Sequence, residues 1–141
     1  MIRVLACGCF DGLHVGHVAH LQEAAKLGDS LIVALTLDPY VNKGAGRPVF
    51  PWRERCRMLK ALSCVTRVVE STDAMSTLVH YKPEIYVKGI EYEGALPEKD
   101  MVEAYGGRVV FLNTLPVYSS TKILTGEQLR DRTRATGQSS D

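Results

Sequence analysis

The 141-residue sequence predicts an α/β fold, because short apolar runs alternate with segments of helical period along most of the chain. The run from Ser30 to Leu37 is almost continuously apolar, which is typical of a parallel strand covered by helices on both faces. Gly28 and Lys82-Pro83 mark breaks between such segments. Repeated βα units predict a single Rossmann-like domain, with a doubly wound, five-stranded parallel sheet and right-handed crossovers.

Each element has its own sequence signals. The expected strands span 3–9, 30–37, 65–70, 85–88 and 108–112, and the expected helices span 15–27, 52–63, 73–80 and 98–105, with a last helix opening at 119–121. Gly28 is expected to end the first helix as a C′ glycine, and Asp73 to cap the third. The domain is expected to cover residues 1–130, and the polar segment 131–141 to fray as a C-terminal tail.

Composition excludes several classes of partner. A net charge of +1 gives no bulk attraction to nucleic acid or to a membrane surface. No apolar run approaches the length of a membrane span, and the first residues lack the layout of a signal peptide. Cys7, Cys9, Cys56 and Cys64 lack the spacing of a zinc site and are expected to be reduced thiols. We therefore expect a cytoplasmic protein with neither nucleic-acid nor membrane partners.

The segment from Gly8 to His17 lies where the first strand turns into the first helix. The start of a helix favours phosphate, because its N–H groups and its positive dipole end attract anions. His14 and His17 are three residues apart and can face the same way, while Gly16 lets a ligand approach the backbone. Solvated or core imidazoles and a zinc site are the alternative interpretations. His20, one turn further along, is expected to be structural or solvated.

Other polar residues follow the carboxyl ends of the remaining strands, which meet at one edge of a doubly wound sheet. Lys43 lies in the glycine-rich loop 41–51, which is interpreted as a flap and is called the flap loop below. Lys43 could also be an ordinary loop lysine. The other candidates are Lys88, Glu91 and Tyr92 after the fourth strand, and Ser119, Ser120 and Thr121 after the fifth. Their convergence predicts a binding site for a nucleoside triphosphate.

The pattern Gly8-x-Phe10-Asp11-x-x-His14-x-Gly16-His17 resembles the first signature of the cytidylyltransferase-like nucleotidyltransferases. The segment Ser119-Ser120-Thr121 resembles the family's second signature, and Arg55 matches an arginine on its second helix, although Arg55 could also be a solvated helix residue. The resemblance covers residues 2–124. It implies attack by a phosphate oxygen of the acceptor on the α-phosphorus of a nucleoside triphosphate, with release of pyrophosphate.

The resemblance also assigns roles to residues. It implies catalytic roles for His14, His17, Lys43 and Arg55, which stabilise the transition state and the leaving pyrophosphate. It implies nucleotide binding by Cys9, Phe10, Asp11, Gly16, Lys88, Glu91, Tyr92, Ser119, Ser120 and Thr121. Mg²⁺ is expected with the triphosphate, held mainly by phosphates and water, so no protein metal site is expected. A homodimer is compatible with the resemblance, because family members are often dimers.

Two branches of the family compete for the substrate. The segments 26–29, 46–49, 87–92 and 105–107 resemble the heptose 1-phosphate adenylyltransferases, which implies ATP and a sugar phosphate. The glycerol-3-phosphate cytidylyltransferases, which use CTP and a polyol phosphate, usually carry arginines where this chain has Ser63 and Asn113. Glu91 departs from the aspartate that is usual in the heptose branch. The base and the acceptor stay open at this point, and a non-catalytic nucleotide-binding protein is the remote alternative.

Overall fold

The structure, a computed structural model, describes residues 1–114. Predictions that concern residues 115–141 lie outside the described residues. They include the last helix, the polar tail, and the site residues Ser119, Ser120 and Thr121.

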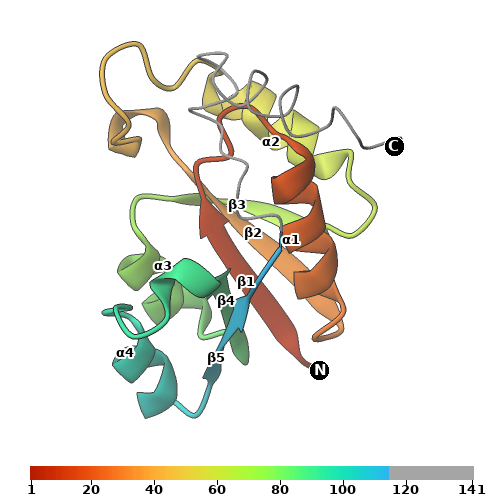
Figure 1. Ribbon diagram of the computed structural model, residues 1–141, viewed down its shortest axis with the longest axis vertical. Helices are drawn as coiled ribbons and strands as arrows, with labels where there is room; N and C mark the ends of the chain where they lie inside the picture. Colours follow the sequence, from red (N-terminus) through yellow and green to blue (C-terminus); the bar gives the residue numbers. More distant parts are fainter. Residues whose placement is uncertain (115–141) are drawn as a thin grey trace, which may run out of the picture.

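The described chain alternates strands and helices in the predicted order (Figure 1). The strands are β1 (Arg3–Gly8), β2 (Ser30–Thr36), β3 (Arg67–Ser71), β4 (Ile85–Gly89) and β5 (Arg108–Leu112). The α-helices are α1 (Val15–Ala25), α2 (Trp52–Lys60), α3 (Ala74–Tyr81) and α4 (Lys99–Ala104), and the 3₁₀ turns are η1 (Asp38–Tyr40) and η2 (Ile90–Tyr92).

All five strands are parallel and lie in the order β3-β2-β1-β4-β5. The central strand β1 pairs Val4 with Leu31 of β2 on one side and with Ile85 of β4 on the other. The chain reverses its direction of winding between β1 and β4, and ligands of open α/β sheets bind beside such a switch point. The predicted fold class is therefore confirmed.

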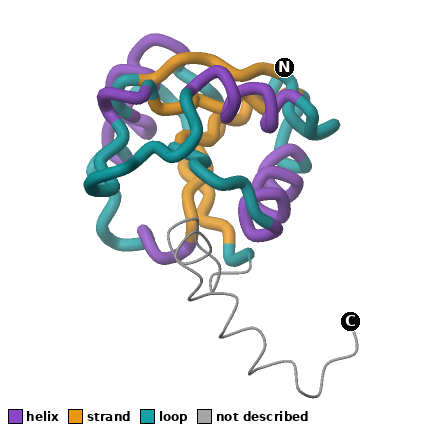
Figure 2. The backbone as a smooth tube through the Cα atoms, turned by 90° about the horizontal axis from the view of Figure 1, so that it is seen from above, coloured by secondary structure: helices purple, strands orange, loops and turns teal. Residues whose placement is uncertain are grey.

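Helices cover both faces of the sheet, as the buried residues show. Leu21 of α1 and Leu59 of α2 pack on one face with Val4, whereas Leu78 of α3 and Val102 of α4 pack on the other. Figure 2 shows the strands lying between the helices. Burial on both faces explains the long apolar run of β2, whose residues 31–35 are all buried.

Two helices end earlier than expected. The N–H groups of Lys26 and Leu27 bond to carbonyls three residues back, so α1 tightens and stops at Ala25. The same change in bonding ends α2 at Lys60 rather than at Ser63. The prediction for Gly28 was wrong. It does not have the left-handed conformation of a C′ residue, and it is needed because a Cβ there would lie 2.6 Å from the Ile2 carbonyl oxygen.

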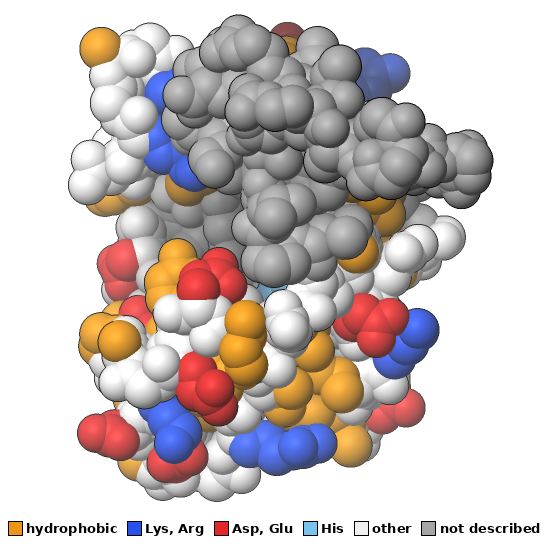
Figure 3. Space-filling view, viewed as in Figure 1, with side chains coloured by type: hydrophobic (Ala, Val, Ile, Leu, Met, Phe, Trp, Pro, Cys, Tyr) orange, Lys and Arg blue, Asp and Glu red, His pale blue; other side chains and the backbone are white. Residues whose placement is uncertain are grey.

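The described surface mixes charges of both signs. On the face shown in Figure 3, acidic and basic side chains lie among one another over the described part. Within residues 1–114, no helix is long and apolar enough to cross a membrane. The four cysteines are free thiols.

Candidate active site

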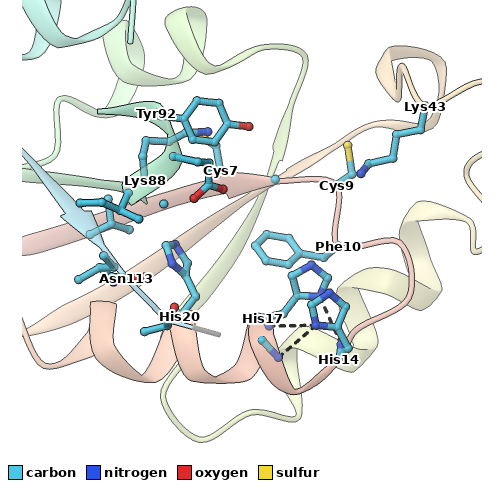
Figure 4. Close-up of a pocket in the computed structure, with 18 residues that line it drawn as sticks. Cys7, Cys9, Phe10, His14, His17, His20, Lys43, Lys88, Tyr92 and Asn113 are labelled. Carbon is cyan, nitrogen blue, oxygen red and sulfur yellow. Dashed lines mark hydrogen bonds between the residues drawn. The ribbon is translucent and has the colours of Figure 1, made fainter. Parts of the chain in front are cut away.

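A cleft of about 380 Å³ opens at the carboxyl edge of the sheet, beside the switch point (Figure 4). Its lining comes from the segment after β1, the first turns of α1, the flap loop, and the ends of β4 and β5. The predicted site residues among its lining are Cys9, Phe10, His14, Gly16, His17, Lys43, Lys88, Glu91 and Tyr92. The topology therefore brings residues from four separate segments together in one cleft.

His14 and His17 together build the start of α1. His14 is the N-cap residue, and its Nδ1 accepts from the backbone N–H groups of Gly16 at 3.1 Å and His17 at 3.4 Å. The backbone N–H of His14 in turn donates to Nδ1 of His17 at 3.3 Å, so the two imidazoles form a capping box. Since both Nδ1 atoms accept, each neutral ring carries its proton on Nε2.

This arrangement changes how the helix start can meet an anion. The N–H groups of Gly16 and His17 already donate to the ring of His14, so the imidazoles are the outer donors of this helix start. Hydrogen bonds in series polarise one another, which strengthens an Nε2–H donor at the end of the chain. The rings of His14 and His17 stack with their centroids 3.7 Å apart, which fixes their orientation.

The environment keeps both imidazoles neutral near pH 7. Burial lowers the pKa of His17 to about 3, with further contributions from His14, Lys43 and His20. Burial and the charge of Lys43 also lower the pKa of His14. The pair therefore acts as hydrogen-bond donors rather than as fixed positive charges, and Lys43 is close enough to influence both rings.

Phe10 supports the histidines from an uncommon backbone conformation. Its φ of 47° lies in the left-handed region, and its buried ring contacts the His17 ring edge-to-face with centroids 5.1 Å apart. The ring also lies over Gly8, where a Cβ would come within 2.8 Å of it. Gly8 of the motif is therefore needed for close packing of the ring that backs His17.

Asp11, which was expected to contact the nucleotide, does not line the cleft. The side chain is fully buried and accepts hydrogen bonds from Arg47 Nε at 2.6 Å and from the backbone N–H groups of Val49 and Phe50 at 2.8 and 2.9 Å. Burial alone would raise the pKa of Asp11, but the bonds from Phe50, Arg47 and Val49 outweigh burial and lower it. In this structure the Asp11 carboxylate holds the end of the flap loop.

Arg55, for which a phosphate contact was expected, is likewise not among the residues that line the cleft in the described structure. Its guanidinium is fully buried and donates to the carbonyls of Phe50, Cys9 and Thr36 at 2.8–2.9 Å. It also pairs with Asp38 at 2.5 Å. These bonds use each of its nitrogens, so in this structure Arg55 ties together the ends of β1 and β2 and the end of the flap loop.

The other end of the cleft combines groups from β4, α1 and β5. The Lys88 ammonium lies 4.1 Å from the centre of the Tyr92 ring, a cation–π contact. The carboxylate of Glu91 lies against Gly89, where a side chain would collide with it. Figure 4 shows His20 and Asn113 at this end, opposite His14 and His17.

The cleft is also lined by residues that were not predicted as part of the site, among them His20, Asn113 and Thr114. His20 lines the cleft rather than lying outside it, and Asn113 and Thr114 line it at the end of β5. Burial and the charge of Lys88 lower the pKa of His20, against a smaller opposing effect of Glu91. A signal existed for two of them: His20 lies three residues after His17, on the same helical face, and Asn113 follows a strand that ends at this edge.

The described residues offer no built metal site of their own. Among residues 1–114, no three His, Cys, Asp or Glu side chains cluster so that they could hold a metal ion. The nearby Asp11 carboxylate is occupied by its three donors.

With this geometry established, similarity to known proteins identifies the family. The cytidylyltransferase-like family model matches residues 5–126. The chain belongs to the cytidylyltransferase-like family. The recognised resemblance and the assignment to the nucleotidyltransferases are thereby confirmed.

Two relatives agree with this assignment. The chain is 46% identical over 126 residues to the bifunctional protein HldE of Streptomyces coelicolor, and 41% identical over 137 residues to that of Syntrophotalea carbinolica. These alignments cover 86% and 92% of the chain but only 27% of each relative, so the chain spans about a quarter of their length.

Two solved structures are similar in fold. The lipopolysaccharide core biosynthesis protein of Thermoplasma volcanium is 31% identical, with a TM-score of 0.69 over 84% of this chain and 99% of that one. Pantothenate synthetase of Thermus thermophilus has a TM-score of 0.65 at 16% identity, covering 93% of this chain and 64% of that one, and shows the fold alone.

Proposed function

We propose that this protein transfers a nucleoside monophosphate from ATP or CTP to a sugar phosphate resembling heptose 1-phosphate, with release of pyrophosphate. The observation that carries the proposal is the pair His14 and His17 at the start of α1, held as neutral donors beside Lys43 in one cleft. Such a pair suits a reaction in which charge develops on phosphate oxygens, because preorganised donors stabilise that charge.

The chemistry needs no nucleophile from the protein. A phosphate oxygen of the acceptor attacks the α-phosphorus, the bond from the α-phosphorus to the bridging oxygen breaks, and pyrophosphate leaves with that oxygen. The protein positions the reactants and stabilises charge, with the Nε2–H groups of His14 and His17 as donors and Lys43 as a cation. Mg²⁺ enters as the partner of the triphosphate and neutralises part of its charge.

The sugar phosphate is favoured by the named relatives and by the local segments. The matched relatives are bifunctional HldE proteins, and one similar structure is a lipopolysaccharide core biosynthesis protein. The segments 46–49 and 87–92 resemble the heptose 1-phosphate adenylyltransferases, which favours ATP. Lys88, Glu91 and Tyr92 then border the base and ribose.

A polyol phosphate with CTP is the second candidate. The resemblance to the glycerol-3-phosphate cytidylyltransferases favours this candidate. Glu91 is compatible with it, because this residue departs from the aspartate that is usual in the heptose branch. Asn113 argues against it, because this residue lines the cleft where that branch usually has an arginine.

The test is a matrix of pyrophosphate release. Each of the four nucleoside triphosphates is combined, with Mg²⁺, with heptose 1-phosphate, glycerol 3-phosphate or no acceptor. We expect release with ATP and heptose 1-phosphate, dependent on both. Release only with CTP and glycerol 3-phosphate would favour the second candidate. Thermal stabilisation by a triphosphate without release for any pair would indicate a non-catalytic nucleotide-binding protein.

A further inference from the structure

The loop between β2 and α2 has two differently held parts. Its last residues, 47–50, are fixed by hydrogen bonds to the buried side chains of Asp11 and Arg55. Its tip, 42–46, is exposed, and Gly44 and Gly46 adopt positive φ values with open space around them. Lys43 stands at this tip and lines the cleft (Figure 4).

The junction between the two parts is Arg47. Its backbone N–H donates to the Gly44 carbonyl at 3.3 Å, which closes the turn that directly follows Lys43. Its side chain, only 10% exposed, pairs with the fully buried carboxylate of Asp11 at 2.6 Å. Asp11 itself belongs to the segment that carries His14. A short chain of contacts therefore links the lysine-bearing turn to the segment that presents the histidines.

The alternative is that the Asp11–Arg47 pair only stabilises the fold. Against this, the side-chain hydrogen bonds that residues 1–114 show for the pair join Asp11 to residues 47–50 of the flap loop. Arg55 and Asp38 already tie the remainder of that loop to the strand ends. The Asp11–Arg47 pair is therefore placed to fix the position of the exposed tip, residues 42–46.

We propose that Asp11 and Arg47 are positioning residues that hold the Lys43 turn against the cleft for the transfer reaction. The proposal rests on the proposed function for its catalytic consequence. Neither side chain is among the described residues that line the cleft. They act through Lys43, whose ammonium must meet the triphosphate when it binds. This role explains why a buried carboxylate in the first motif is matched by an arginine in a loop 36 residues away.

A double-mutant cycle between Arg47 and Lys43 tests this coupling. We expect kcat for pyrophosphate release to fall about tenfold in Lys43→Ala and about fivefold in Arg47→Ala, and the double variant to be at most about twofold slower than Lys43→Ala. Arg47→Lys should recover part of the loss, because it can still pair with Asp11. Arg53→Ala, which removes an exposed arginine of α2, is the matched control and should match the parent protein.

The proposal would be overturned if the fold-loss of kcat in the double variant equalled the product of the losses in the two single variants, because Arg47 would then act independently of Lys43. Unchanged kcat in Arg47→Ala would overturn it equally. The melting temperature of each variant separates loss of fold from loss of position. If Arg47→Ala melts well below the parent protein, Arg47→Lys replaces it in the double-mutant cycle.

Limited trypsin digestion tests the anchor without using activity. Trypsin cleaves after Lys43 at a rate set by the freedom of this turn. We expect cleavage to be at least about threefold faster in Arg47→Ala than in Arg53→Ala, because local opening needs fewer bonds to break. Equal rates would overturn the anchor. If the parent protein released no pyrophosphate with any substrate pair, the proposed function would fail, while this comparison would still decide whether Arg47 holds the turn.

Discussion

The two edges of the sheet use charged groups in opposite ways. At the amino edge, Arg3 and Glu84 satisfy each other: the guanidinium donates to both carboxylate oxygens and to the carbonyls of Tyr81 and Lys82. The backbone N–H of Arg3 adds a further bond to Glu84 at 2.7 Å. At the carboxyl edge, His14, His17 and Lys43 instead line an open cleft.

The pKa shifts express the same contrast. The hydrogen bonds from Arg3 lower the pKa of Glu84 to about 2, which favours its charged form in the folded protein. Burial lowers the pKa of His17 to about 3, which disfavours its charged form. The charges at the amino edge pair with each other, whereas His14, His17 and Lys43 at the carboxyl edge line a cleft. Substitutions at the two edges should therefore separate stability from activity.

The largest effect is expected at His17. Glutamine at this position can keep the capping-box bond to the His14 N–H while it removes the imidazole. His17→Gln should lower kcat by about 10²–10³-fold, the usual loss for a donor to a transition state, with little change in melting temperature. His80→Gln, at an exposed position of α3, is the control. Near-normal turnover in His17→Gln would remove His17 from the chemistry.

Arg55 lies near the cleft, but like Arg3 at the amino edge it donates to backbone carbonyls and pairs with a carboxylate of the protein. Arg55→Ala should lower the free energy of unfolding by about 3 kcal/mol or more, because three buried carbonyls lose their donor. Chemical denaturation measures this loss, with the exposed Arg57→Ala as the control. A variant that melts like the parent protein but turns over slowly would show instead that Arg55 acts on the phosphates.

The lowered histidine pKa values predict a pH dependence of stability. Between pH 6.5 and about 3 the unfolded chain binds a proton at residue 17 that the folded chain does not, so stability falls as the pH drops through this window. His17→Gln should flatten the slope between pH 6.5 and 5 by at most about 1.4 kcal/mol per pH unit. His14 and His20 keep a residual slope, because their pKa values are also lowered. Identical slopes in the two proteins would contradict this assignment.

The smallest effect is expected at the amino edge. Arg3→Ala should cost about 1 kcal/mol of stability or less, because the pair with Glu84 is partly exposed, and it should leave kcat unchanged. The contribution of Glu84 is present above its unfolded pKa of 4.5 and is lost as the pH falls toward 2. Denaturation at pH 7 and pH 3 measures it. A clear loss of turnover in Arg3→Ala would break the contrast between the two edges.

The sequence predicted the fold well because its signals are local and repeated. The alternation of apolar runs with helical periods correctly placed all of the described strands and α-helices, and β5 was predicted with its observed bounds. The helix ends were predicted less well, because the tightening after Ala25 and Lys60 depends on backbone bonds that leave no clear residue pattern. The role of Gly28 depends on Ile2, a partner that only the tertiary structure brings near.

The site was predicted by residue type but not by contact. The motif indicated His14 and His17 as a pair. It did not indicate that each ring accepts a hydrogen bond from the backbone N–H of the other residue, which forms the helix cap. The motif and the resemblance pointed to Asp11 and Arg55, but their charges turn inward because loop 47–50 and the ends of β1 and β2 supply donors and acceptors there. A sequence shows which charges are present, and only the fold shows which are already neutralised.

The most direct test of the central claim is ³¹P NMR of the products made by the parent protein and by His17→Gln from ATP, Mg²⁺ and heptose 1-phosphate. The account predicts that the parent protein forms one pyrophosphate for each new phosphoanhydride between the nucleotide and the sugar phosphate. It predicts that His17→Gln forms both at least about 10²-fold more slowly while folding normally. Equal rates in the two proteins, or pyrophosphate without a new phosphoanhydride, would contradict it.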